Sequence, residues 1–481
     1  MGKERGFMEH ERLDPGYRPI EERVEDYGAV ERQLTDKQLV VQATRCMDCG
    51  VPFCCTTGCP LANVIPEFND LVYQERWPEA LDMLLLTNPF PEFTGRICPA
   101  PCETSCVLGI NKEPVAIRQI EVSIVENAFR RGVLKANPPP QRHEARIAVV
   151  GSGPAGLGVA DVLNRYGYNV VVYEKNRNPG GLLRYGIPDF KLEKWVVERR
   201  IQLMQDEGVV FETGVEIGRD LSSHYLRDRF DAIVLTGGAE QPRDLPIPGR
   251  DLKGIHFAMD FLTQQNQRNG GETVTQTEIS AKGKHVVVIG GGDTGSDCVG
   301  TSNRQGALSV TQLEIMPEPA GERPPETPWP LWPASRRDSS SHREGCERRW
   351  SVQTEFFEGT DDHVSQLKCC EVEWVTPKDG GRPSPRKVKG SDFLLPADLV
   401  LLSMGFVGPG PNRLVDDLEL KLDPRGMIQR DADHKTSHPR VFVAGDMTHG
   451  ASLVVRAIND GCETARSVVQ WLESKEAQPT T

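Results

Sequence analysis

Residues 146–156 read RIAVVGSGPAG, and this stretch decides the fold of the chain. Its first five residues are typical of a buried parallel strand, and a G-x-G-x-x-G turn follows at once. The first glycine permits a tight turn, the second lets the backbone approach a pyrophosphate, and the third lets the next helix pack closely on the strand. The N-terminus of that helix offers unpaired N–H groups and the positive end of its dipole to phosphates. The predicted binding residues of this turn are Gly151, Gly153, Pro154, Ala155 and Gly156.

The next apolar strand ends in an acid where a dinucleotide site needs one. Residues 170–174 read VVVYE, and Glu174 lies 18 residues past Gly156. At this distance a carboxylate can accept a hydrogen bond from a ribose hydroxyl. Because strand, glycine turn, helix and acid occur together, we expect a bound dinucleotide here rather than a glycine turn without a ligand.

The same arrangement occurs a second time. Residues 285–289 read HVVVI, the turn GGGDTG follows at 290–295, and Glu314 lies 19 residues after the last glycine. The predicted binding residues are Gly290, Gly292, Asp293, Thr294, Gly295 and Glu314. A nicotinamide can transfer its hydride only when a second redox ring lies next to it. Two Rossmann-type sites therefore predict FAD in one and NADH or NADPH in the other.

The residues around the second acid bear on which nicotinamide is used. The 2′-phosphate of NADPH needs cationic donors, but residues 313–317 read LEIMP. Glu314 can accept from a free 2′-hydroxyl and would repel a phosphate, which favours NADH. Arg304 and Arg323 lie close enough in sequence to supply cations, so NADPH remains the alternative.

Cysteines crowd into one part of the chain. Eight of the thirteen fall between residues 46 and 106, which indicates metal binding in a reducing compartment. Seven are well spaced, and Cys55 stands beside Cys54 as an extra thiol. The first spacings would suit zinc or iron-sulfur equally. Structural zinc usually recruits histidine, and none lies between His10 and His143, so we expect two cuboidal iron-sulfur clusters.

Charge and hydropathy argue against several classes of partner. The formal net charge of -13 offers no attraction to nucleic acid or to an anionic membrane surface. No stretch approaches 18 uninterrupted apolar residues, and the first thirty residues mix both charges instead of forming a signal peptide. We therefore expect a cytoplasmic protein that binds neither nucleic acid nor membrane. Residues 1–35 show no pattern that predicts chemistry.

The cysteine blocks and several glycine-rich motifs resemble a known family. They read CMDCGVPFC at 46–54, GCP at 58–60, PEFTGRICPAPCE at 91–103, GGLLRYGIP at 180–188 and PIPGR at 246–250. With these motifs the chain resembles the small, or beta, subunit of glutamate synthase, and similar modules open dihydropyrimidine dehydrogenase. The resemblance runs from about Arg45 to Leu472.

This resemblance implies a ligand set for each cluster. One 4Fe-4S cluster would be bound by Cys46, Cys49, Cys54 and Cys106, and the other by Cys59, Cys98 and Cys102. The eighth ligand is then not a cysteine. Relatives use a carboxylate or amide shortly downstream, where this chain has Glu121. As alternatives, Glu121 is a solvated helix residue, and Cys55 competes with Cys54 as a ligand.

The order of the glycine turns is similar to that of two-dinucleotide flavoprotein reductases, whose FAD domain is interrupted by the nicotinamide domain. This implies an α/β fold with an α-helical iron-sulfur domain at 1–140 and two Rossmann-type domains. The FAD-binding domain would comprise 145–280 and 396–481, and the NAD(P)H-binding domain 281–395. Prolines at 138–140 support the first boundary, because proline cannot continue a helix.

The same resemblance implies further flavin contacts. The Gly445-Asp446 pair would place an acid on the ribityl chain of FAD; alternatively, Asp446 is a helix N-cap. The other residues expected at the flavin are Gly181, Leu182, Gly237, Ser452 and Leu453.

In function, the resemblance implies an NAD(P)H-dependent flavoprotein oxidoreductase with no catalytic side chain of its own. Electrons would pass from the nicotinamide to FAD and through two 4Fe-4S clusters to the large (alpha) subunit of glutamate synthase, which makes glutamate from glutamine and 2-oxoglutarate. A stand-alone oxidoreductase serving ferredoxin, a pyrimidine or a sulfur compound is one alternative. A redox-sensing subunit without turnover is an alternative from another class.

Overall fold

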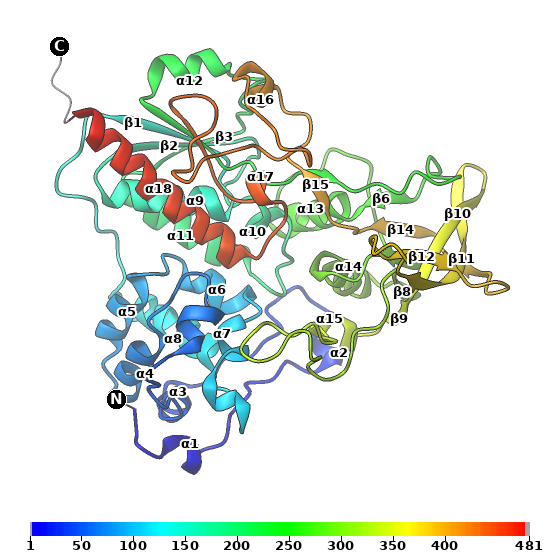
Figure 1. Cartoon of the computed structure of the whole chain (residues 1–481), viewed down its shortest axis with the longest axis horizontal. Helices are drawn as coiled ribbons and strands as arrows, with labels where there is room; N and C mark the ends of the chain where they lie inside the picture. The colour runs from blue at the N-terminus through cyan, green and yellow to red at the C-terminus, as the bar shows by residue number, and fades with distance from the viewer. Residues whose placement is uncertain (1, 477–481) are drawn as a thin grey trace.

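The computed structural model describes residues 2–476 of the 481-residue chain. The N-terminal helices lie at one end, the first parallel sheet lies above them, and the second parallel sheet lies to one side of both (Figure 1). The long C-terminal helix α18 (Val454–Glu476) returns to the first sheet, and its end near Val454 points toward the N-terminal helices. Within the described residues, none of the helices combines the length and apolar character needed to span a membrane.

The N-terminal module is α-helical, as predicted. Its helices are α3 (Asp36–Ala43), α4 (Ile65–Tyr73), α5 (Trp77–Leu85), α6 (Pro91–Ile97), α7 (Pro101–Thr104) and α8 (Ile117–Arg130). Proline occupies the first turn of α4, α5 and α6, where its missing N–H costs no hydrogen bond. Between Glu67 and Leu86 the apolar residues recur at helical spacing, which predicts a helical stretch there. The structure has two helices in this stretch, because Glu75 takes a left-handed conformation (φ 59°) between them.

An extended arm precedes this module and contains only the short helices α1 (Gly6–Glu9) and α2 (Ile20–Arg23). Its backbone bonds to itself between Tyr17 and Glu31, and the Val30 N–H donates to the Phe190 carbonyl 3.0 Å away. The arm therefore contacts a segment that lies beyond the first glycine turn.

The first sheet is parallel and has the strand order β16-β4-β1-β2-β3. Its strands are β1 (Arg146–Val150), β2 (Asn169–Glu174), β3 (Val210–Thr213), β4 (Ala232–Leu235) and β16 (Val441–Val443). Helices α9 (Pro154–Arg165) and α18 pack closely together beside it. Because β16 pairs with β4 in register, the first Rossmann unit is completed only near the end of the chain, which confirms the interrupted arrangement.

The second sheet is also parallel, with the order β6-β14-β7-β8-β9. Its strands are β6 (Ile255–Phe257), β7 (His285–Ile289), β8 (Ser309–Glu314), β9 (Glu347–Trp350) and β14 (Leu399–Leu402). The boundaries expected from the sequence place residues 255–257 and 399–402 in the FAD domain, outside the 281–395 segment. Strand β14 instead pairs with β7 on one side and with β6 on the other, so the second unit reaches beyond both expected boundaries. An apolar run predicts a buried strand but does not say which sheet it joins.

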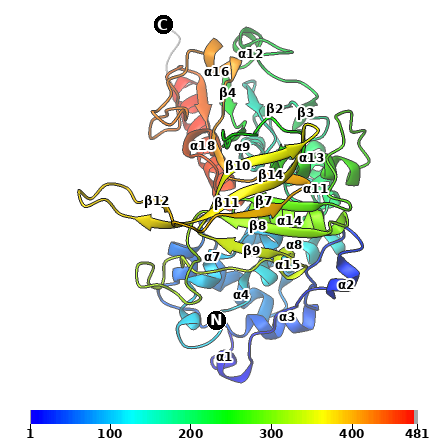
Figure 2. The ribbon, with the colours of Figure 1, turned by 90° about the vertical axis from the view of Figure 1, so that its right-hand side faces the viewer.

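The remaining elements connect or extend the two Rossmann units. The helices are α10 (Leu182–Tyr185), α11 (Lys194–Asp206), α12 (Ser223–Arg229), α13 (Ala258–Asn269), α14 (Asp293–Arg304), α15 (Ser340–Arg343), α16 (Arg413–Asp417) and α17 (Asp446–His449). An antiparallel extension comprises β10 (Val352–Thr360), β11 (His363–Val375), β12 (Ser384–Lys387) and β13 (Phe393–Pro396), and the β12 hairpin projects from the body (Figure 2). Proline, serine and charged residues dominate the sequence at 317–345, which predicts an irregular segment there. In the structure this segment contains only the one-turn helix α15, and its Trp329 ring packs edge-on against Phe53, with 4.8 Å between the ring centres.

Candidate cofactor sites

The first glycine turn has the close backbone contacts that its sequence predicts. Gly151 has a φ of 107°, and a Cβ there would lie 2.6 Å from the Thr236 carbonyl oxygen. A Cβ on Gly156 would lie 1.9 Å from the Gly151 carbonyl oxygen. Gly153 caps α9 and faces open space, since a Cβ added to it would meet no atom within 4 Å. The turn therefore leaves room for a phosphate where the helix N–H groups are unpaired.

Glu174 ends β2 directly beside this turn. Its Oε2 accepts from the Ser152 N–H at 3.2 Å, and its Oε1 accepts from the Asn176 N–H at 2.8 Å. The carboxylate is thus held in one place at the edge of the turn, where an adenosine ribose would lie in a bound dinucleotide.

Three distant loops converge on the same turn. A Cβ on Gly181 would lie 2.7 Å from the Gly153 Cα, and one on Gly445 would lie 2.9 Å from the Ala155 Cβ. The Gly237 N–H donates to the Met447 sulfur at 3.0 Å. Leu182 and Leu453 stand at or next to the starts of α10 and α18. The structure therefore brings together the segments from which flavin contacts were expected.

Asp446 does not cap a helix. Gly445 occupies the N-cap position of α17, and no side chain caps that helix. The Asp446 carboxylate instead accepts from the Ser452 hydroxyl at 2.8 Å, and burial raises the pKa of Asp446 above its usual value. Asp446 and Ser452 therefore form one polar group next to Gly445.

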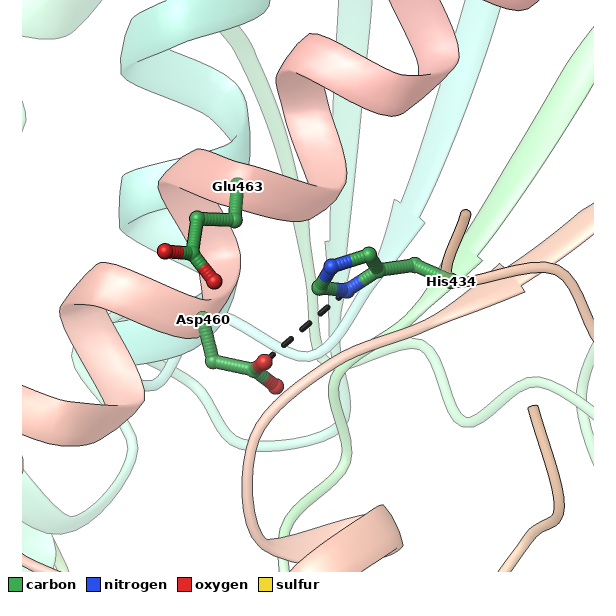
Figure 3. Close-up of side chains that lie close together, drawn as sticks. All are labelled: His434, Asp460 and Glu463. Carbon is green, nitrogen blue, oxygen red and sulfur yellow. Dashed lines mark ion pairs between the residues drawn. The ribbon is translucent and has the colours of Figure 1, made fainter. Parts of the chain in front are cut away.

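Three side chains near Gly445 lie close enough together to hold a metal ion: His434, Asp460 and Glu463 (Figure 3). Arg430, however, donates to Asp460 Oδ1 at 2.7 Å and lies 2.7 Å from His434 Nδ1. A metal ion would be repelled by this fixed guanidinium charge. Asp460 also accepts from the Gly445 N–H at 2.6 Å, so the group anchors the Gly445 turn.

The second glycine turn repeats the geometry of the first. Gly290 has a φ of 123°, and a Cβ on Gly295 would lie 2.4 Å from the Gly290 carbonyl oxygen. Gly292 caps α14, which begins with Asp293 and Thr294, and it faces open space. Glu314 ends β8 and accepts from the Gly291 N–H at 2.7 Å. The second acid therefore lies beside its turn in the way that Glu174 lies beside the first.

The two arginines considered as cations for this site are engaged elsewhere. The Arg304 side chain is fully buried and pairs with Glu344 at 2.6 Å, and its guanidinium lies 3.8 Å from the centre of the Phe190 ring. Arg323 donates to the Thr327 carbonyl at 3.0 Å.

One hollow in the N-terminal module is lined by Cys46, Cys49, Cys54 and Cys106, together with apolar side chains and Asn69. Asp48 takes a left-handed conformation (φ 49°) and turns the chain between the first two cysteines. The four thiols expected to bind one cluster therefore face one space, although they come from segments up to 60 residues apart.

A second hollow is lined by Cys59, Cys98, Cys102 and Glu121. Glu121 is not a solvated helix residue. Its carboxylate is buried, accepts from the Asn63 and Asn88 amides at 3.3 and 3.2 Å, and also accepts from the Thr94 hydroxyl. Burial raises the pKa of Glu121 to about 7.

The thiols of both hollows suit a metal cluster better than free cysteines. Burial raises the pKa of Cys46 to about 11, and that of Cys59 and of Cys98 to about 12. Such thiols are inert as nucleophiles at neutral pH, whereas a bound metal displaces their protons and satisfies several thiolates at once. Cys55 lines neither hollow, and its sulfur lies 3.9 Å from that of Cys54.

Val455 and Arg118 are among the residues of the second hollow that were not predicted. Val455, in the first turn of α18, lines it and lies three residues after Ser452, the partner of Asp446. Arg118, at the start of α8, also lines it. A local sequence pattern could not identify Val455, because its position follows from the packing of α18 on the N-terminal module.

Comparisons with known proteins agree with both halves of this architecture. Residues 145–461 match the family model described as pyridine nucleotide-disulphide oxidoreductase, and residues 23–133 match that of dihydropyrimidine dehydrogenase domain II, 4Fe-4S cluster. Among solved structures, FprA from Mycobacterium tuberculosis superposes with a TM-score of 0.57 at 21% identity, over 69% of this chain and 86% of that one. At this identity the likeness shows the fold.

Curated relatives match over nearly the whole chain. The glutamate synthase [NADPH] small chain of Mycobacterium tuberculosis is 51% identical over 98% of this chain and 97% of that protein, and the one from Bacillus subtilis is 41% identical over the full length of both. Glutamate synthase [NADH] of Schizosaccharomyces pombe is 46% identical over all of this chain, which corresponds to 23% of that longer protein. The chain therefore belongs to the glutamate synthase small-chain family and is an oxidoreductase of the pyridine nucleotide-disulphide type.

Proposed function

We propose that this chain is the electron-input subunit of a glutamate synthase, which oxidises NAD(P)H and passes electrons to a large subunit. One observation carries the proposal: the start of α18 joins the flavin side of the first glycine turn to the second cysteine hollow. Ser452 holds Asp446 on one side of this junction, and Val455 lines the hollow on the other. This junction would place a dinucleotide site and a metal site close together, so that electrons could pass from one to the other.

The first glycine turn suits FAD. Gly153 and the N-terminus of α9 would receive the pyrophosphate, and Glu174 would accept from the adenosine ribose. Asp446, with Ser452, would bind the ribityl chain. The residues proposed to enclose the rest of the flavin are Gly151, Pro154, Ala155, Gly156, Gly181, Leu182, Gly237, Gly445 and Leu453.

The second glycine turn suits the nicotinamide dinucleotide. Gly290, Gly292 and Gly295 would bring backbone close to its pyrophosphate, with Asp293 and Thr294 at the helix N-terminus. Glu314 would accept from the adenosine ribose. No side chain is needed as a covalent catalyst, because the chain's contribution is to bind, orient and shield the two rings.

The two hollows suit 4Fe-4S clusters. Cys46, Cys49, Cys54 and Cys106 would bind one, and Cys59, Cys98, Cys102 and Glu121 the other. FAD can accept a hydride as an electron pair, and each cluster can carry one electron; that is the chemistry these groups supply when bound. Since Val455 lines the Glu121 hollow, we place that hollow next to the flavin and the Cys49 hollow toward the acceptor.

The names of the relatives support the proposal that a large subunit of glutamate synthase accepts the electrons. A small chain implies a large chain, and the S. pombe glutamate synthase contains the equivalent of this chain within a longer protein. The proposal is tested by adding the purified chain to the isolated large subunit and measuring NAD(P)H-dependent formation of glutamate from glutamine and 2-oxoglutarate. If the chain reduces artificial acceptors rapidly but supports no glutamate formation, it serves another acceptor.

The cofactor content is a first prediction. Protein prepared without oxygen is expected to contain one FAD and about eight irons per chain, because two cubane clusters need eight. Iron and acid-labile sulfide analysis, with a visible spectrum, measures this. Zinc without labile sulfide would contradict the cluster assignment and leave the flavin assignment intact.

The second prediction concerns the coenzyme, on which the names of the relatives differ. We expect a higher kcat/KM with NADH than with NADPH, because the Glu314 carboxylate lies beside the second turn and would repel a 2′-phosphate. Arg304, buried with Glu344, cannot offset that repulsion without breaking its ion pair. Glu314→Ala should shift the kcat/KM ratio toward NADPH.

Steady-state kinetics with both coenzymes measure this shift. Glu347→Ala is a suitable control, since it removes an exposed carboxylate from the neighbouring strand β9. A preference for NADPH in the unmodified chain that Glu314→Ala leaves unchanged would show that Glu314 does not contact the ribose.

A further inference from the structure

Arg118 brings a positive charge to the hollow of Glu121. Among the described residues it is the only lysine or arginine that lines either cysteine hollow. It is the second residue of α8, one helical turn before Glu121, and its guanidinium donates to the carbonyls of Gly95 and Arg96 at 2.9 and 3.2 Å. These contacts hold the charge in one place.

The counterion of Arg118 comes from the N-terminal arm, for which the sequence predicted no chemistry. Both terminal nitrogens of Arg118 donate to the Glu31 carboxylate, one of them at 2.8 Å. The Gln119 amide donates to the same carboxylate at 2.8 Å. Burial alone would lower the pKa of Arg118, but its acidic neighbours, Glu31 foremost, together outweigh burial and raise it, so the guanidinium is firmly charged.

This ion pair is oriented with respect to the hollow. Arg118 lines the hollow and Glu31 does not, so the positive end faces the cysteines. The other nearby acid, Glu103, is balanced by Arg12, whose guanidinium donates to it at 2.7 Å.

We propose that Arg118, held in place by Glu31 of the N-terminal arm, raises the reduction potential of the 4Fe-4S cluster in the Glu121 hollow. This inference rests on the proposed function in that it requires the cluster. The physical reason is that the reduced cluster carries one more negative charge than the oxidised one, and a nearby cation in a low-dielectric interior stabilises the more negative state. Arg118 thus adjusts the reduction potential of the cluster, and Glu31 determines how strongly the Arg118 charge acts on the cluster.

Substitution of the two members of the ion pair is expected to shift the midpoint potential in opposite directions. Arg118→Gln removes the cation and leaves the Glu31 anion, so the midpoint potential of this cluster should fall. Glu31→Gln leaves the cation uncompensated, so the potential should rise. The double variant should lie between the two single variants. The measurement is a potentiometric titration of the full, cofactor-loaded chain, in which the reduced clusters are followed by electron paramagnetic resonance.

Arg130→Gln is the matched control. Arg130 lies on the same helix and also pairs with an acid that precedes the first cysteine, Asp36, but its side chain is 60% exposed and lines neither hollow. Its removal should leave both potentials unchanged.

Unchanged potentials in Arg118→Gln and Glu31→Gln, with full iron content, would overturn the proposal even if both variants were less stable. If Arg118→Gln does not retain iron, Arg118→Lys and Glu31→Gln decide the matter: Lys should keep the potential near that of the unmodified chain, and a Glu31→Gln potential that does not rise would refute the inference. An absence of iron from the unmodified chain would instead refute the proposed function, so the two failures are distinguishable.

Discussion

Replacing Cys102 or Cys49 with alanine is expected to abolish electron delivery to the acceptor while leaving reduction of the flavin by nicotinamide largely intact. The reason is spatial separation. Each thiol lines a hollow in the N-terminal module, whereas both glycine turns lie in the Rossmann units. Loss of one ligand should remove the cluster from one hollow and interrupt electron transfer to the acceptor. The nicotinamide and FAD would still bind next to each other.

Stopped-flow measurement of flavin reduction, beside steady-state reduction of the acceptor, separates the two steps. Cys370→Ala is the matched control, because Cys370 is buried like Cys102 but lies on β11 and lines neither hollow. Iron content should fall in the Cys49 and Cys102 variants and not in the control. Equal loss of both steps in a folded, FAD-loaded Cys102 variant would contradict the assumed separation.

The second large effect is expected from a matched pair of glycine substitutions. Gly156→Ala should yield protein without FAD, because the new Cβ would lie 1.9 Å from the Gly151 carbonyl oxygen and would force α9 away from β1. Gly295→Ala should retain FAD but lose nicotinamide binding, because its Cβ would lie 2.4 Å from the Gly290 carbonyl oxygen. Overpacking of this kind costs about 1–3 kcal/mol, which corresponds to roughly a 5- to 150-fold loss of affinity.

The flavin spectrum of the purified variants and kcat/KM for the nicotinamide measure these two losses. Gly321→Ala is the control, since a Cβ there meets no atom within 4 Å and its φ is not in the left-handed region. The opposite pattern, with flavin lost from Gly295→Ala and kept by Gly156→Ala, would show that FAD binds at the second turn and the nicotinamide dinucleotide at the first.

Local patterns in the sequence were sufficient for the two glycine turns and their acids. Each turn combines an apolar strand, three glycines and a helix within about 25 residues, and each structural consequence arises inside that stretch: a positive φ at the first glycine and backbone contact at the third. The positions of Glu174 and Glu314 follow for the same reason, since adjacent parallel strands end at one edge of a sheet.

The cysteine sets needed more than spacing. Cysteine density and the absence of histidine predicted clusters, but the division into two interleaved sets came from resemblance to a family. In the structure Cys106 lies in the hollow of Cys46, and Cys59 in that of Cys98. Spacing alone would have grouped cysteines that are neighbours in the sequence. Where the chain turns back between two such cysteines, they line different hollows.

What the sequence determined by itself is therefore local: the helical character of the stretch near residues 67–86, the two turns, and the residues able to bind cofactors. Only the tertiary structure decided that β14 belongs to the second sheet, that Arg304 is paired with Glu344, and that Glu31 of the arm holds Arg118 beside Glu121. The physical reason is that turns and helices depend on neighbours a few residues apart. Strand partners and buried ion pairs depend on which surfaces exclude water together, and those surfaces come from segments tens to hundreds of residues apart.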